Sequence, residues 1–342
     1  MAASETATAG GIDPLTRRAF ATMVGVVGAV LVALAAGFEN PYWAGLSAIV
    51  IAHADPDELF TKGILRIAGT FAGVFFGYYG AQLLEGLPAA QALAAMLAAG
   101  IGIYARQRSA YAYAWFYGAV TFLIVIVSSM VTPTELRAFA ENRCFEIVTG
   151  VVVATLARWA LGGDGHKGAR LVAHPPTVRP EDAMRLAVAA GVGTLAILVS
   201  WTQFQLPQLT QVVISSLIVV DIDAGATRRR GWQRVLGCII GGIAGLLVIG
   251  IDATDFLWWL MCLAIGLFVF SRIHLAASPN AYVGTQSAIA FLVTLVDTGP
   301  PSSIGPPFGR LVGIVLGVSL MSLVTWAITK KGPAAETVTP PG

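Results

Sequence analysis

The sequence predicts an all-α integral membrane protein with twelve transmembrane helices. We expect them to form two parallel six-helix repeats related by a pseudo-twofold axis along the membrane normal. Three observations lead to this prediction. The chain is strongly apolar, it repeats a set of residues 168 positions later, and its basic residues sort onto one side of the membrane.

The composition excludes a soluble domain. Hydrophobic residues make up 56% of the 342 positions and charged residues only 12%, and the mean hydropathy is +0.75. A soluble domain carries about 25% charged residues. The three cysteines and four histidines are scattered without the spacing of a disulfide framework or a metal site, so we expect no metal and no cofactor. Phosphate loops, nucleophile elbows and paired catalytic carboxylates are absent from the sequence, which predicts that the protein is not an enzyme.

The internal repeat consists of residues that recur at a nearly constant spacing. The pairs 168 positions apart are Arg17/Arg185, Ser47/Ser215, Asp55/Asp223, Arg66/Arg234, Gly69/Gly237, Gly73/Gly241 and Gly77/Gly245. At a spacing of 169 or 167 come Tyr113/Tyr282, Phe122/Phe291, Arg143/Arg310, Gly150/Gly317 and Trp159/Trp326. A repeat of this length made of apolar helices is typical of a duplicated half of a membrane protein, as in many transporters.

Ten apolar runs are long enough, or nearly so, to cross the hydrocarbon core, which needs about 20 residues. They are 19–37, 64–84, 89–105, 112–130, 143–162, 183–201, 234–251, 256–272, 281–297 and 308–328. Two shorter runs, Pro41 to Ala54 and Pro207 to Val220, occupy equivalent places in the two halves. The first run resembles a signal peptide, but its equivalent after Arg185 is internal, so we interpret it as a retained helix.

The charge distribution decides whether the two short runs cross. If all twelve runs cross, eighteen of the 21 lysines and arginines lie on one side, and only Arg137, Arg143 and Arg310 lie on the other. Re-entrant short runs would scatter the basic loops over both faces. The positive-inside rule therefore favours twelve crossings with both termini cytoplasmic.

The same topology divides the chain into five segments. They are an N-terminal cytoplasmic tail (1–16), the first six-helix repeat (17–162), a cytoplasmic linker (163–182), the second six-helix repeat (183–329) and a C-terminal tail (330–342).

An arginine and three glycines share one helical face in each half, because they stand at positions i, i+3, i+7 and i+11. These are Arg66, Gly69, Gly73 and Gly77, and again Arg234, Gly237, Gly241 and Gly245. Glycines in such a row typically allow close helix packing. The arginines either snorkel to the cytoplasmic headgroups or line a path between the repeats, where a planar guanidinium captures a carboxylate through two hydrogen bonds.

Three carboxylates are candidates for gating or coupling. Asp55 and Asp223 end the two short runs and either pair with the arginines eleven residues later or lie in water at helix ends. Glu146 follows Arg143 by three residues, so it forms a structural ion pair or relays a proton. Arg143 and Arg310 open the last helix of each half on the outer side.

Aromatic residues gather in the segment Tyr111-Ala-Tyr-Ala-Trp-Phe-Tyr117, and Tyr282 repeats Tyr113. Such clusters form interfacial belts in many membrane proteins. Beside cationic groups they also suit an aromatic ring that carries a carboxylate, through stacking and cation–π contacts.

Four segments carry a family resemblance. They are Asn40-Pro41-Tyr42-Trp43-Ala44, Arg66-x-x-Gly69-Thr70-x-x-Gly73, the aromatic segment that leads to Thr121, and Arg143-x-x-Glu146-x-x-x-Gly150. Together they resemble the fusaric acid resistance (FUSC) family over nearly the whole membrane region, in two copies. In the second copy Gln205-Leu-Pro207-Gln208 replaces the Pro-Tyr-Trp, and Gly313 replaces Glu146.

The family that the chain resembles includes bacterial inner-membrane exporters of aromatic carboxylic acids and is distantly similar to plant aluminium-activated malate transporters. The resemblance therefore implies a bacterial inner-membrane protein with such an export function. With the repeated arginines, it leads us to expect an exporter of small organic, aromatic carboxylates that is driven by protons or the membrane potential. The expected path residues are Arg66, Arg234, Tyr113, Tyr282, Arg143 and Arg310. The expected partners are the organic anion, the lipid bilayer, and either a periplasmic adaptor protein or a second copy of the chain, but no nucleic acid. The linker 163–182 has no room for the cytoplasmic domain of the large family members.

Two other functions fit the same residues. In an organic-anion channel the arginines would line an electropositive pore. In a non-transporting envelope or assembly protein, apolar side chains would seal the centre, and Arg66 and Arg234 would point to lipid headgroups.

Overall fold

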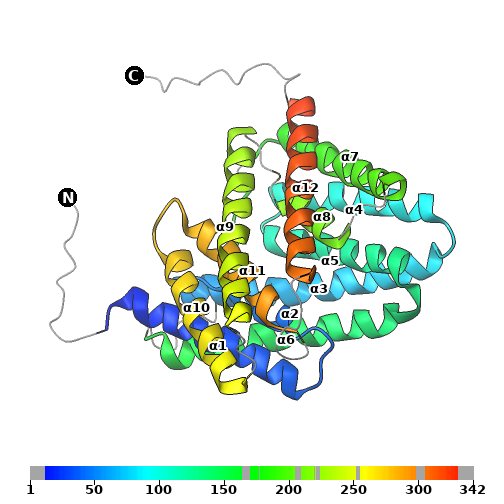
Figure 1. Ribbon diagram of the computed structural model, residues 1–342. Helices are drawn as coiled ribbons and strands as arrows, with labels where there is room; N and C mark the ends of the chain where they lie inside the picture. Colours follow the sequence, from blue (N-terminus) through cyan, green and yellow to red (C-terminus); the bar gives the residue numbers. More distant parts are fainter. Residues whose placement is uncertain are drawn as a thin grey trace, which may run out of the picture. The chain divides into compact units, whose positions relative to one another are not determined.

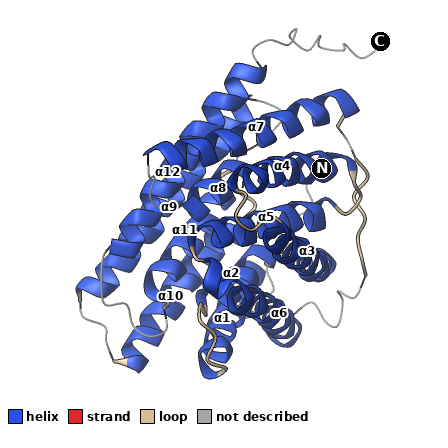
Figure 2. Cartoon of the chain, turned by 90° about the vertical axis from the view of Figure 1, so that its right-hand side faces the viewer, coloured by secondary structure: helices blue, strands red, loops and turns tan. Residues whose placement is uncertain are grey.

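The computed structural model of the chain describes residues 12–163, 170–176, 178–204, 209–218, 220, 224–251, 255–297 and 305–329, and in these ranges no strand occurs (Figures 1 and 2). The helices are α1 (Pro14–Ala35), α2 (Tyr42–Ile51), α3 (Pro56–Leu83), α4 (Pro88–Arg108), α5 (Ala112–Val131), the 3₁₀-helix η1 (Pro133–Glu135), α6 (Leu136–Leu161), α7 (Pro180–Phe204), α8 (Leu209–Ile218), α9 (Ala224–Gly250), α10 (Phe256–Leu275), α11 (Ala281–Leu295) and α12 (Gly305–Thr329). The predicted all-α class is confirmed.

Each predicted apolar run coincides with a helix, although some helices begin earlier than the run. Helix α3 begins at Pro56, well before the apolar run that starts at residue 64. Asp57 and Glu58 lie in its first turn, where negative charge interacts favourably with the positive end of the helix dipole. Apolar composition detects only the part of a helix that lies in lipid, so it misses such charged first turns.

Among the described residues, eight helices are long and apolar enough to cross a membrane, namely α1, α3, α4, α5, α6, α7, α9 and α10. The chain is therefore a multi-pass membrane protein. Helices α2 and α8 have only ten residues each. At 1.5 Å per residue each is about 15 Å long, about half of the 30 Å hydrocarbon core. Crossing of the membrane by all twelve helices stays a prediction.

The chain forms two compact units, and these do not follow the two halves of the sequence. Unit 1 comprises residues 1–67, 142–172 and 236–307, and unit 2 comprises residues 68–141, 173–235 and 308–342. Unit 1 thus contains α1, α2 and most of α6 from the first half, with most of α9, α10 and α11 from the second. Unit 2 contains α7, α8 and most of α12 from the second half, with most of α3, α4 and α5 from the first.

In unit 1, helix α2 lies in the core. It packs against α1 and α11, and α1 also packs against α10. Leu46, Ile49 and Ile51 of α2 are buried in one apolar cluster with side chains of these helices and of α6. Trp259 of α10 is also buried there, and its indole N–H donates to the carbonyl of Leu295 at 2.9 Å. The burial of α2 fixes where its polar residues lie.

In unit 2, helix α8 packs against α5 and α7, and α4 packs against α5 and α7 (Figure 2). Small residues allow α4 and α7 to approach closely. A Cβ on Gly191 would lie 3.0 Å from the carbonyl oxygen of Met96, and a Cβ on Gly100 would lie 3.2 Å from that of Ala187. Such small residues are typical of close helix packing in membranes, where no hydrophobic effect draws helices together.

Candidate functional site

In unit 1 a buried arginine contacts the short helix α2. Arg66 of α3 is 5% exposed, and its Nε donates to the hydroxyl oxygen of Ser47 at 3.4 Å. Ser47 is fully buried and donates in turn to the carbonyl of Trp43 at 2.9 Å. A guanidinium stays charged even when buried, so this contact places a fixed positive charge beside α2.

In unit 2 the equivalent residues make the equivalent contact. Arg234 of α9 is 4% exposed, and its Nη2 donates to the hydroxyl oxygen of Ser215 on α8 at 3.1 Å. Ser215 is fully buried. Both arginines are therefore buried in their own units beside a helix of half length. The recurrence of the two serines is visible in the sequence, but their contact with the arginines is not.

The short helices are crossed by a second helix at a glycine. A Cβ on Gly150 of α6 would collide with the carbonyl oxygen of Ala44 on α2, and one on Gly317 of α12 would collide with that of Val212 on α8. These backbones touch because glycine has no side chain. In each case the serine that holds the arginine also lies within 3.1 Å of that Cβ position.

The predicted glycine faces lie where α3 meets α5 and where α9 meets α11. Cβ atoms on Gly69, Gly73 and Gly77 would meet Ala114, Gly118 and Val125 of α5, and those on Gly237, Gly241 and Gly245 would meet Val283, Ser287 and Thr294 of α11. The partners on α5 and α11 are 169 positions apart in each case. Close backbone packing therefore explains these glycines.

Another buried arginine, Arg143, lies in the N-terminal part of α6 in unit 1. The guanidinium carbon of Arg143 lies 3.7 Å from the ring centroid of Trp43, and its Nη1 is 3.6 Å from Oε2 of Glu146. The other carboxylate oxygen of Glu146 accepts from the backbone N–H of Asn40 at 3.1 Å. Arg143 is 3% exposed and Glu146 is 1% exposed. The carboxylate thus has a cation and a backbone donor, which is the arrangement of a structural ion pair.

The other residues predicted to line the path or to act in gating differ in burial and contacts. Asp55 is exposed, and its Oδ1 accepts from the backbone N–H of Asp57 at 2.8 Å, which is the geometry of a helix-end residue. Tyr113 is half-buried with its ring 4.6 Å from that of Tyr117, and Tyr282 is half-buried in the first turn of α11. Asp223 and the side chain of Arg310 lie outside the described residues.

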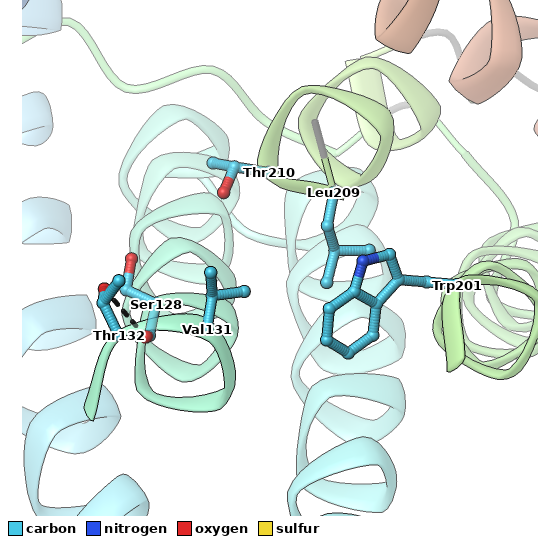
Figure 3. Close-up of a pocket in the computed structure, with 6 residues that line it drawn as sticks. All are labelled: Ser128, Val131, Thr132, Trp201, Leu209 and Thr210. Carbon is cyan, nitrogen blue, oxygen red and sulfur yellow. Dashed lines mark hydrogen bonds between the residues drawn. The ribbon is translucent and has the colours of Figure 1, made fainter. Parts of the chain in front are cut away.

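A pocket of about 350 Å³ in unit 2 was not predicted (Figure 3). Its lining residues come from the end of α5, the end of α7 and the start of α8; they are Ser128, Val131, Thr132, Trp201, Leu209 and Thr210. The volume is at the lower end of the range for small-molecule pockets. Lining residues that are scattered over three separate helices give no sequence pattern that would reveal the pocket.

Metal ligands do not gather anywhere in the described part of the chain: no three His, Cys, Asp or Glu side chains form a group that could hold an ion.

Comparison with known protein sequences places the chain in a family. The sequence model described as fusaric acid resistance protein-like matches residues 28–157 and 194–325, one segment in each half of the chain. The chain belongs to this family. The resemblance in the four sequence segments is thereby confirmed.

Curated relatives of this family member are efflux pump subunits. The p-hydroxybenzoic acid efflux pump subunit AaeB of Musicola paradisiaca (strain Ech703) is 31% identical over 144 residues, which is 38% of this chain and 22% of that protein. The AaeB subunit of Yersinia pestis (strain Pestoides F) is 34% identical over 152 residues, 41% of this chain and 23% of that protein. The chain thus spans less than a quarter of the length of these relatives. They are transporters and not enzymes, as predicted for this family member. No solved structure matches the chain.

Proposed function

We propose that the protein exports small aromatic carboxylates across the bacterial inner membrane. The observation that carries this proposal is the pair of buried arginines, Arg66 and Arg234, each bonded to a serine of a half-length helix. The named relatives, which are p-hydroxybenzoic acid efflux pump subunits, support the substrate class.

The burial of the arginines argues against a purely structural role. An arginine at the centre of a membrane helix costs about 2.5–3.5 kcal/mol on insertion scales. Snorkelling to the headgroups would lower this cost, yet Arg66 and Arg234 are each about 95% buried against protein. A carboxylate that arrives between the helices would bind the guanidinium fork through two charge-assisted hydrogen bonds, with the serine hydroxyl as a further polar contact.

The half-length helices α2 and α8 support a substrate path beside the two buried arginines. Because α2 and α8 are each about 15 Å long, polar chain segments at their ends reach into the region where lipid tails would otherwise lie. Such segments are tolerated only inside protein or along a water-filled cavity, and discontinuous helices are where many transporters bind substrate. In this scheme Tyr113 of unit 2 and Tyr282 of unit 1 each offer an aromatic contact to the substrate ring, and Arg143 and Arg310 draw the anion toward the outer side.

We further propose that the two halves are parallel six-helix repeats with twelve crossings and cytoplasmic termini. The equivalent contacts of Gly150 and Gly317, and of the two arginine–serine pairs, support this arrangement. A periplasmic adaptor protein or a second copy of the chain stays a predicted partner.

The test is exchange of labelled benzoate in everted membrane vesicles that contain the protein. The double variant Arg66→Ala with Arg234→Ala should lower the exchange rate at least tenfold, and Arg137→Ala should not change it. Arg137 is a suitable control because it is an exposed arginine that pairs with Glu141. Unchanged exchange in the double variant would refute the site. Large currents that reverse at the benzoate equilibrium potential would identify a channel instead of a pump.

A further inference from the structure

The pocket in unit 2 is lined by one aromatic ring, two apolar side chains and three hydroxyl-bearing side chains (Figure 3). Val131 of α5 and Trp201 of α7 approach it from opposite sides, and Leu209 of α8 lies beside the indole. The volume of about 350 Å³ suits a ligand with a single ring. The polar groups of the lining indicate what such a ring must carry.

Two of the three hydroxyls are available to a ligand. Thr132 uses its hydroxyl within α5, where it donates to the carbonyl of Ser128 at 3.4 Å. The hydroxyls of Ser128 and Thr210 and the indole N–H of Trp201 have no hydrogen-bond partner among the residues that the structure describes. Each hydroxyl can donate one hydrogen bond and accept others, and the indole can only donate.

The lining favours a neutral ligand, because none of the six lining residues carries a charge. A carboxylate in this pocket would lose water without gaining a cation, which costs far more than placing a neutral hydroxyl there. A phenol titrates near pH 10 and is neutral at pH 7. Its hydroxyl can donate to and accept from Ser128 and Thr210, and its ring can stack on Trp201. The pocket therefore selects a ring with a hydroxyl over a ring with a carboxylate.

The first half of the chain carries a phenol at the equivalent position. The residues 168 positions before Trp201 and Thr210 are Ala33 and Tyr42. Ala33 is fully buried, and Tyr42 packs against the apolar cluster of unit 1. In unit 2 the smaller Thr210 supplies no ring at this position and borders a pocket instead. A phenol bound there would replace the ring that the second half lacks.

We propose that this pocket is a binding site for small, uncharged phenols. The site contains neither Arg66 nor Arg234, so it goes beyond the proposed function and takes a ligand without a carboxylate. In the proposed topology the C-terminal ends of α5 and α7 lie on the outer side of the membrane, and phenols reach the pocket from that side.

The first experiment measures the fluorine NMR line broadening of 4-fluorophenol by the detergent-solubilised chain at pH 7. We expect broadening that saturates with ligand concentration. 4-Fluorotoluene, in which a methyl group replaces the hydroxyl, should bind about fivefold more weakly, because it makes no hydrogen bond. Broadening that does not saturate, or that is equal for the two ligands, would show only partition into the detergent micelle and would refute the site.

Four variants locate the binding. Thr210→Tyr places in the pocket the ring that Tyr42 supplies in unit 1, so it should abolish saturable binding without lowering the melting temperature. Ser128→Ala should weaken binding about two- to tenfold through the loss of one hydrogen bond, and Trp201→Leu should weaken it by a similar factor. Trp258→Leu is the control, because Trp258 of α10 is 47% exposed and belongs to unit 1. If Trp201 only anchors α7 at the membrane interface, Trp201→Leu will bind 4-fluorophenol as well as Trp258→Leu does, and the site is refuted.

The double variant Arg66→Ala with Arg234→Ala separates this site from the proposed function. It should bind 4-fluorophenol like the wild type, although its benzoate exchange should fall. If the wild type binds 4-fluorophenol as expected and does not exchange benzoate, the exporter proposal fails and the phenol site stands. If benzoate is exchanged and Thr210→Tyr binds 4-fluorophenol as well as the wild type does, the phenol site is refuted and the exporter proposal stands.

Discussion

In unit 1 the guanidinium carbon of Arg143 lies 3.7 Å from the ring centroid of Trp43. Both residues belong to segments that carry the resemblance to the fusaric acid resistance family. Trp43 is in the second position of α2, and Arg143 is buried in α6. A cation over an indole face is worth about 2 kcal/mol when both groups are desolvated. This contact therefore fixes the start of α2 to α6, where Glu146 also binds Asn40.

Replacing Trp43 should loosen this end of α2. We expect Trp43→Leu to lower the stability of the detergent-solubilised protein by about 2 kcal/mol, since leucine fills part of the space but offers no π face. Trp43→Phe should cost less because phenylalanine keeps a weaker aromatic face. Thermal unfolding followed by size-exclusion chromatography would measure both. Equal losses in the two variants would show that packing, and not the cation–π contact, is responsible.

Two adjacent glycines of α9 provide a matched test of helix packing. A Cβ on Gly241 would collide with the carbonyl oxygen of Ser287, whereas one on Gly242 would meet no atom within 4 Å. We expect Gly241→Ala to destabilise the protein by about 1–3 kcal/mol through overpacking. Gly242→Ala should be neutral or stabilising, because alanine is a better helix former by about 1 kcal/mol. Similar melting temperatures for the two variants would contradict the packing of α9 on α11.

These contacts show what the sequence predicts and what it does not. The apolar runs predict the helices because lipid demands apolar residues over a known length. The recurrence of Gly69, Gly73 and Gly77 predicts a packing face, since only small residues allow backbones to touch. The partner helix is not predictable in this way. Nothing local in α1 indicates that it packs on α10, because that contact depends on the three-dimensional arrangement of the chain.

The candidate site was predictable in its charges and not in its hydrogen bonds. Arg66 and Arg234 can be recognised as site candidates from the sequence because an arginine in an apolar helix is rare. Ser47 and Ser215 cannot, because a serine in a membrane helix commonly bonds its own backbone, as Ser47 also does. Glu146 has no counterpart in the second half, where the equivalent position holds Gly313. This asymmetry between the halves is visible in the sequence, whereas the hydrogen bond that the carboxylate of Glu146 accepts from the backbone N–H of Asn40 is not.

The serines should affect how well the arginines bind the substrate. We expect Ser47→Ala with Ser215→Ala to raise the apparent KM for benzoate exchange several-fold with little change in the maximal rate. The loss of one hydrogen bond to a charged group corresponds to about 1.5–3 kcal/mol at most. The same substitutions in the Arg66→Ala, Arg234→Ala background should have no further effect. Additive losses would indicate that the serines act independently of the arginines.

The turn between α2 and α3 should make stability depend on pH. Burial lowers the pKa of His53 below its ordinary value of 6.5, and the positive charge of Lys62 lowers it further. Its Nδ1 accepts from the backbone N–H of Asp55 at 3.1 Å, which requires that nitrogen to be unprotonated. The unfolded chain binds a proton at a higher pH than the folded chain does, so this contribution to stability is present above pH 6.5 and is lost as the pH falls through the lower folded value. We expect His53→Gln to flatten the melting temperature between pH 7.5 and 5, with His174→Gln as the control. An unchanged pH dependence in His53→Gln would contradict this assignment.

The composition of the two units leads to a prediction about the separated halves of the chain. Unit 1 needs α10 and α11 from the second half to cover α1 and α2, and unit 2 needs α4 and α5 from the first half to cover α7 and α8. Neither half can therefore complete a unit from its own helices. If the chain is divided in the linker between residues 163 and 170, a tagged first half should copurify with the second half in equal amounts when both are expressed together. Each half expressed alone should be degraded or should aggregate, because its apolar helix faces lack their partners. A stable, monomeric first half would show that helices of one half can pack among themselves, and it would contradict the interleaved composition of the units.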